Sequence, residues 1–125
     1  MKKIISCDKA PAALGPYNHA CEANGFVFTS GQIGIDPATG KLVEGVEAQT
    51  RQVLTNLGNV LATAGASFAD VLKVTAFILD MADFATVNKV YSEFFTADFP
   101  GRSCVAVKQL PAGALVEIEC IACKG

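Results

Sequence analysis

The chain has 125 residues, 51% of them apolar, and a formal net charge of −2. A chain of this length forms one domain, residues 1–125, and no apolar run approaches the roughly 20 residues that span a bilayer. Its lysines are spread from end to end without a basic run, which argues against nucleic acid as the main ligand.

The N-terminal part of the chain predicts three short strands. Residues 3–6 form a candidate edge strand. Residues 18–22 and 26–30 form a hairpin around Asn24-Gly25, the strongest short turn signal. The Gly- and Pro-rich residues 31–40 then break the third strand and make a further turn.

Two helices with a strand between them follow. Apolar residues across 46–64 recur on one face of a helix, which Gly65 ends. Residues 71–79 predict a strand, and Asp83 is a candidate N-cap for a second helix that runs to Phe95. Alternate residues of the strand form one fully apolar face: Leu72, Val74, Ala76 and Ile78.

The C-terminal part predicts a second hairpin. Strands at 102–108 and 114–123 flank a turn at 110–113 that contains Pro and Gly. Side chains alternate along a strand. The second strand therefore places Val116, Ile118, Cys120 and Ala122 on one face and Leu115, Glu117, Glu119 and Ile121 on the other.

Carboxylates on a partly apolar face need solvent, a cation or a ligand. Close pairing of the hairpin would bring Arg102 near Glu117 or Glu119, and an arginine there is a candidate receptor for a small carboxylic acid. A purely structural ion pair between Arg102 and one of these carboxylates is an equally weighted alternative from the residues alone.

The element order is therefore β-β-β-α-β-α-β-β. Two helices can cover only one face of such a sheet, and the other face still carries Leu, Phe and Ile among polar residues. A second copy of the chain is the simplest cover for that face, and any site on it would then be shared between subunits.

The N-terminus shows no apolar h-region and no small-residue cleavage site, so we expect no secretory signal and a cytoplasmic protein. Five scattered cysteines then read as free thiols. Cys104 is expected to be a small buried hydrophobe, and His19, the one histidine, to be a structural or surface residue.

Four segments together resemble the Rid (YjgF) family of reactive-intermediate imine deaminases, in order and spacing over nearly the whole chain. They are Gly15-Pro16-Tyr17, residues 28–34 (Phe-Thr-Ser-Gly-Gln-Ile-Gly), residues 83–88 (Asp-Phe-Ala-Thr-Val-Asn), and Phe99-Pro100-Gly101-Arg102-Ser103 followed by Glu117-Ile118-Glu119.

This resemblance implies an α+β, chorismate-mutase-like (bacillary type) subunit with a mixed sheet and two helices on one face. It also implies a homotrimer with clefts between subunits. The implied activity is the hydrolytic deamination of 2-imino and enamine acids, such as 2-aminoacrylate and 2-iminobutyrate, to 2-keto acids and ammonia. No cofactor and no metal are implied, and the activity would protect against damage by these intermediates.

The resemblance also implies roles for single residues. Arg102 corresponds to the residue that grips the substrate carboxylate, and Glu117 to the acid/base group beside the imine and its attacking water. The remaining pocket residues correspond to Tyr17, Ser30, Gly31, Asn88 and the main chain around Cys104.

Other functions remain open at this point. A regulatory module that binds 2-keto acids would keep Arg102 without turnover, and some relatives are described as endoribonucleases or translation inhibitors. A thiol-based redox chaperone would depend on the cysteines. Chorismate mutase is least favoured, because its dicarboxylate substrate needs several cations and the chain has only two arginines.

Overall fold

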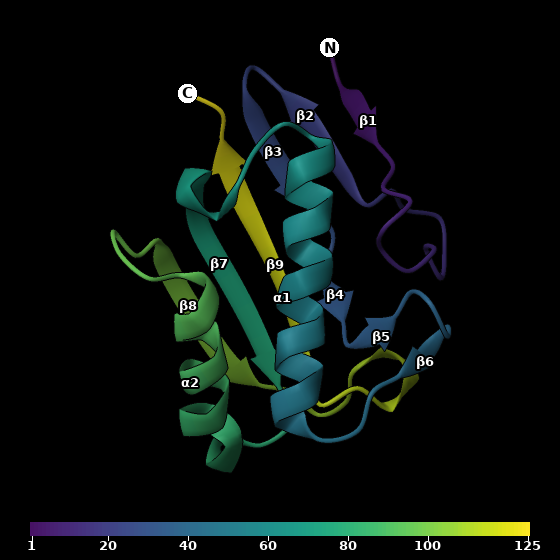
Figure 1. Cartoon of the computed structure of the whole chain (residues 1–125), viewed down its shortest axis with the longest axis vertical. Helices are drawn as coiled ribbons and strands as arrows, with labels where there is room; N and C mark the ends of the chain where they lie inside the picture. The colour runs from purple at the N-terminus through teal and green to yellow at the C-terminus, as the bar shows by residue number, and fades with distance from the viewer.

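The computed structural model describes residues 1–125 as one mixed sheet with two helices on one of its faces (Figure 1). In spatial order the sheet contains β1 (Lys3–Ile5), β2 (Ala20–Ala23), β3 (Phe26–Thr29), β9 (Val116–Cys123), β7 (Val71–Ile78) and β8 (Gly101–Ala106), and β4 (Gln32–Ile33) also pairs with β9. A separate hairpin is made by β5 (Ile35–Asp36) and β6 (Lys41–Leu42).

The helices are α1 (Val46–Thr63) and α2 (Phe84–Phe94). Three single turns of 3₁₀ helix connect the elements: η1 (Phe68–Asp70), η2 (Met81–Asp83) and η3 (Pro111–Gly113). Neither α-helix combines the length and the apolar character that crossing a bilayer requires.

The core lies between the helices and the sheet. The apolar stripe of α1 is fully buried, and it meets the inward residues of the central strands β7 and β9. Along β9 the burial alternates as the sequence predicts, with Val116, Ile118, Cys120 and Ala122 in the core. The α+β architecture and the two helices on one face are thus confirmed (Figure 1).

The predicted N-terminal hairpin is confirmed as the pair β2–β3. Its turn residues Asn24 and Gly25 have φ angles of 53° and 81°, the left-handed conformation that a two-residue hairpin turn requires. The predicted edge strand is β1, which pairs with β2.

The predicted C-terminal hairpin is wrong. β8 runs parallel to β7, β9 runs antiparallel to β7 on its other side, and so β7 lies between the two supposed hairpin strands. A strand that returns from a crossover helix pairs in parallel with the strand before that helix, which is what β7-α2-β8 does. The segment from Val107 to Leu115 then crosses the end of β7 to reach β9.

Two local predictions also need correction. A bulge between Val71 and Lys73 changes the phase of β7, so Val71 is buried and Leu72 is 53% exposed, the reverse of the predicted alternation at these residues. Asp83 precedes α2 but its side chain forms no capping hydrogen bond. The Asp80 side chain instead accepts one from the Ala82 N–H at 2.9 Å.

The face of the sheet opposite the helices carries exposed apolar side chains. Phe26, Phe28 and Val105 on it are 39%, 48% and 46% exposed, and the partly buried Phe77 and Ile121 lie between them in the register. We call this surface the open face. Glu117 and Glu119 lie on it because they alternate with the buried residues of β9.

Candidate functional site

Arg102 lies on the edge strand β8 and faces α2. Its register partner on β7 is the buried Val74, so its side chain starts on the helix-covered side of the sheet. Its Nη2 donates to Oδ1 of Asn88 at 2.7 Å, and its guanidinium carbon lies 4.7 Å from the centroid of the Tyr91 ring.

No carboxylate partners this guanidinium. The four ion pairs of the structure use Arg51, Lys89 and Lys124 as their cations. The alternative of a structural ion pair with Glu117 or Glu119 is therefore wrong within one copy of the chain. Arg102 lines a cavity of about 270 Å³ together with Asn88, Tyr91, Ser92, Phe99 and Pro100. A half-buried cation that is bonded only to a neutral amide keeps donors available for an anion.

Cys104 lies next to Arg102 on β8 and packs against the core. Burial raises the pKa of its thiol, despite the opposing effect of Arg102. A thiol with a raised pKa holds little thiolate, which agrees with the expected apolar packing role of Cys104. Burial likewise raises the pKa of Cys120 to about 11, which weakens the case for thiol-based chemistry.

Glu117 lies on the open face beside Gly31. A Cβ built on Gly31 would lie 2.8 Å from Cδ of Glu117, so the carboxylate rests against bare main chain. Desolvation raises the pKa of Glu117, and the charge of Glu119 raises it further. The group therefore retains a proton at a higher pH than an ordinary glutamate, which suits a proton donor and acceptor.

Tyr17 lies in the loop that precedes β2. Ser30 directly follows β3 and is hydrogen-bonded to the same loop. The Tyr17 hydroxyl accepts a hydrogen bond from the Leu14 N–H at 3.1 Å, and the Ser30 hydroxyl donates to the Asn18 carbonyl at 2.6 Å. Tyr17 and Gly31 line one small cavity together, and Gly31 lies against Glu117.

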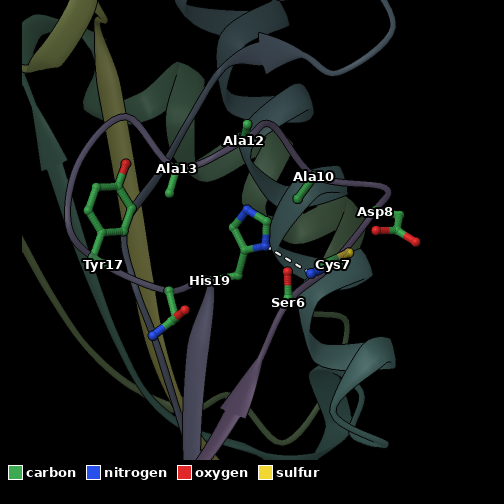
Figure 2. A pocket seen from close by; sticks show the side chains of 9 residues that line it. Ser6, Cys7, Asp8, Ala10, Ala12, Ala13, Tyr17 and His19 are labelled. Carbon is green, nitrogen blue, oxygen red and sulfur yellow. Dashed lines mark hydrogen bonds between the residues drawn. The ribbon is translucent and has the colours of Figure 1, made fainter.

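His19 lines a cavity beside the loop that precedes β2, and Figure 2 shows its ring hydrogen-bonded to Cys7 there. Its buried ring accepts a hydrogen bond from the Cys7 N–H at Nδ1 (2.9 Å) and lies 2.7 Å from the Pro11 carbonyl through Nε2. The expected structural role of His19 is confirmed.

The predicted site residues thus form two groups rather than one. Arg102, Asn88 and Cys104 form the first on the helix-covered side, and Tyr17, Ser30, Gly31 and Glu117 form the second around the open face. The expectation that Arg102 lies near the β9 carboxylates within one copy is wrong, because β7 separates the two strands and the side chains leave the sheet on opposite faces.

Two aromatic rings that flank Arg102 were not among the predicted site residues. They are Phe84 and Tyr91, both on α2. Phe84, Asn88 and Tyr91 are spaced by four and three residues, so they share one face of α2. The Asn88 amide between two aromatic residues on one helix face was the sequence signal that could have identified this contact.

No group of three or more His, Cys, Asp or Glu side chains in the structure is placed to hold a metal ion. The first group offers a cationic receptor for an anion, and the second offers a proton-exchanging carboxyl.

Comparison with known proteins adds independent information. The family described as "Endoribonuclease L-PSP" matches residues 7–124. Bovine 2-iminobutanoate/2-iminopropanoate deaminase is 48% identical, covering 100% of this chain and 92% of the bovine protein. The deaminase of the same name from Salmonella typhimurium is also 48% identical, over 98% of each chain. The crystal structure of E. coli TdcF with bound serine superimposes with a TM-score of 0.95 at 44% identity, covering 98% of this chain and 99% of TdcF.

Proposed function

This chain belongs to the endoribonuclease L-PSP (YjgF/Rid) family, and from that membership we propose how its two groups of site residues work. The protein hydrolyses 2-imino acids, and the enamines that tautomerise to them, to 2-keto acids and ammonia. Relatives named as 2-iminobutanoate/2-iminopropanoate deaminases match it over the whole chain. We place this activity in the cytoplasm, where it removes reactive intermediates.

The active site is formed between two copies of the chain in a homotrimer. The observation that supports this is the separation of Arg102 from Glu117 on opposite faces of one sheet. The exposed Phe26, Phe28 and Val105 of the open face give a second copy an apolar surface to cover. Arg102 of one copy then faces Glu117 of its neighbour across a cleft.

In this cleft the guanidinium of Arg102 binds the substrate carboxylate, held in orientation by Asn88. Glu117 accepts a proton from the attacking water as the water oxygen bonds to the imine carbon, the C=N π bond breaks, and the imine nitrogen takes up a proton from bulk water. The resulting carbinolamine collapses when Glu117 returns its proton to nitrogen, the C–N bond breaks and ammonia leaves. The hydroxyl proton passes to bulk water, which restores the proton taken up earlier, and the keto acid remains. The raised pKa of Glu117 suits both directions of transfer.

The deciding experiment is the Arg102→Ala variant in a coupled assay, in which a dehydratase generates 2-iminobutyrate and keto-acid release is measured with and without this protein. We expect the enzyme-dependent rate to vanish while the trimer stays folded, because the substrate loses its anchor. Arg51→Ala is the matched control, since Arg51 forms exposed ion pairs with Glu47 and Glu93 and does not line the cavity of Arg102. Equal rates for Arg102→Ala and wild type would refute the proposal.

A binding module without turnover is the second candidate. The bound serine in the TdcF structure supports it, because that structure shows an amino acid held by a relative 44% identical to this chain. Glu117→Gln separates the two functions. A deaminase loses rate with this variant, whereas a binding module keeps its affinity for 2-oxobutyrate and has no rate to lose.

A further inference from the structure

The guanidinium of Arg102 lies against aromatic rings of α2. Its carbon is 4.7 Å from the centroid of the Tyr91 ring and 5.6 Å from that of Phe84. A cation within about 6 Å of an aromatic centroid is attracted by the ring electrons, and the attraction grows where water is excluded. Tyr91 is the nearer of the two rings and is buried, so it makes the stronger contact.

Tyr91 is held firmly from behind. Its ring stacks on Phe95 with 4.4 Å between centroids and 19° between planes, and Phe95 in turn meets Phe68 edge-on at 4.9 Å. Tyr91 and Phe95 are only 7% and 4% exposed. The ring that receives Arg102 is therefore the outer end of an aromatic column that is anchored in the core.

The hydroxyl of Tyr91 takes no part in this contact. Its oxygen is buried without any hydrogen-bond partner, and the remaining polar contact of the guanidinium is the bond to Asn88. Arg102 therefore contacts the aromatic ring of Tyr91 and not its hydroxyl group.

We infer that Tyr91 is a positioning residue for substrate binding. Its ring and the Asn88 amide together fix the plane of the Arg102 guanidinium before the substrate carboxylate arrives. The inference rests on the proposed function only for the identity of that carboxylate. A planar donor that is already oriented loses less freedom when it forms two parallel hydrogen bonds, so the ring raises affinity for carboxylates.

The test compares Tyr91→Leu and Tyr91→Phe in the assembled protein, with 2-oxobutyrate as the calorimetric probe. We expect Tyr91→Leu to weaken binding about 3- to 30-fold, and to raise KM for 2-iminobutyrate by a similar factor with much less change in kcat. Tyr91→Phe restores the ring and should bind like wild type.

Arginine Nε–Hε resonances give a readout that a general loss of stability would not move. The chain has only two arginines, so the exposed Arg51 serves as the internal reference for Arg102. The Arg102 signal should carry the same ring-current shift in wild type and Tyr91→Phe, and in Tyr91→Leu this shift should shrink to the smaller contribution of Phe84. Val27→Ala, a fully buried change on β3, which β9 and β7 separate from β8, should lower stability while leaving this shift and the affinity unchanged.

Wild-type affinity together with an Arg102 resonance that stays at its wild-type position in Tyr91→Leu would overturn the inference, as would a Tyr91→Phe variant that behaves like Tyr91→Leu. The proposed function is tested separately. A wild type whose binding of 2-oxobutyrate depends on the Tyr91 ring, but which never hydrolyses the imine, would refute the deaminase and leave the role of Tyr91 standing. If Tyr91→Leu and Tyr91→Phe both hydrolyse the imine like wild type, the deaminase stands and the role of Tyr91 is refuted.

Discussion

At the scale of single residues, the second group of the site depends on Gly31 having no side chain. Gly31 has no Cβ, and the Glu117 side chain occupies the space where one would be. The φ angle of Gly31 is not positive, so the requirement for glycine comes from this close approach alone. The carboxylate is thereby placed against the start of β4 and partly shielded from water.

Gly31→Ala should displace Glu117 and reduce deaminase activity by about 100-fold, because a shift of about 1 Å in a reacting group has that effect. Gly101→Ala is the control, since a Cβ there would meet its nearest atoms at 3.7 and 3.8 Å, which is ordinary contact. We expect the control to keep its rate in the same coupled assay. A fully active Gly31→Ala would mean that the position of Glu117 is not needed.

The raised pKa of Glu117 has a consequence for stability. The folded state binds the proton more tightly than the unfolded chain does, so the native protein loses stability as pH rises through the raised pKa. Glu117→Gln should therefore increase the free energy of unfolding at pH 7 by less than about 1 kcal/mol, because the group is partly solvated. At pH 3 the difference should disappear, since the wild-type carboxyl is then protonated in both states.

Denaturant titrations of both proteins at one concentration check this dependence. Glu93→Gln should act with the opposite sign, because the hydrogen bond from Arg51 lowers the pKa of Glu93. Equal stability of Glu117→Gln and wild type at every pH would contradict the expected penalty.

At the scale of elements, the buried Asn56 of α1 links the helix to the strands that follow the site. Its Nδ2 donates to the Ile33 and Ile35 carbonyls at 3.3 and 2.9 Å, and its Oδ1 accepts from Gln52 at 2.8 Å. Ile33 belongs to β4, which begins directly after Gly31. The amide thus holds the segment against which Glu117 rests.

Asn56→Ala should destabilise the protein by about 2–4 kcal/mol, because two buried carbonyls lose their donor. Asn59→Ala is the control, since its single bond to the Lys9 carbonyl is exposed and should contribute little. Chemical denaturation measures both variants. A loss of similar size in the two would show that burial of the Asn56 bonds is not decisive.

Elements that depend on local sequence could be predicted, whereas the order of the strands could not. Alternation along β9 and the Asn24-Gly25 turn depend on neighbours in the chain, so they were predicted correctly. The order β9-β7-β8 depends on the path of α2, and two Val-rich strands around a Pro-Gly break fit either arrangement. The contact of Arg102 with Tyr91 was missed because it joins a strand to a helix face that also serves the core.

At the scale of the whole molecule, the proposed site would make the assembly the unit of activity, because Arg102 and Glu117 lie on opposite faces of one sheet. Arg102→Ala and Glu117→Gln subunits are each expected to be inactive alone. After they are mixed, unfolded and refolded together, a cleft can combine Arg102 from one kind of subunit with Glu117 from the other. Random assembly should restore about a quarter of wild-type activity, because each half of a cleft is intact with even odds.

The coupled assay on the refolded mixture measures this recovery, and each variant refolded alone is the control. A mixture as inactive as its components would indicate that both residues must come from the same copy. The double variant, Arg102→Ala with Glu117→Gln, should stay inactive after it is refolded alone.

The placement of Arg102 and Glu117 on opposite faces of one sheet also bears on inheritance. Two alleles with lesions on different faces would complement each other in a cell that carries both, whereas two lesions on the same face would not. A double-lesion allele would be partly dominant, because each defective copy would spoil both clefts to which it contributes. Phenotypes of paired mutations would therefore sort by sheet face rather than by distance along the gene.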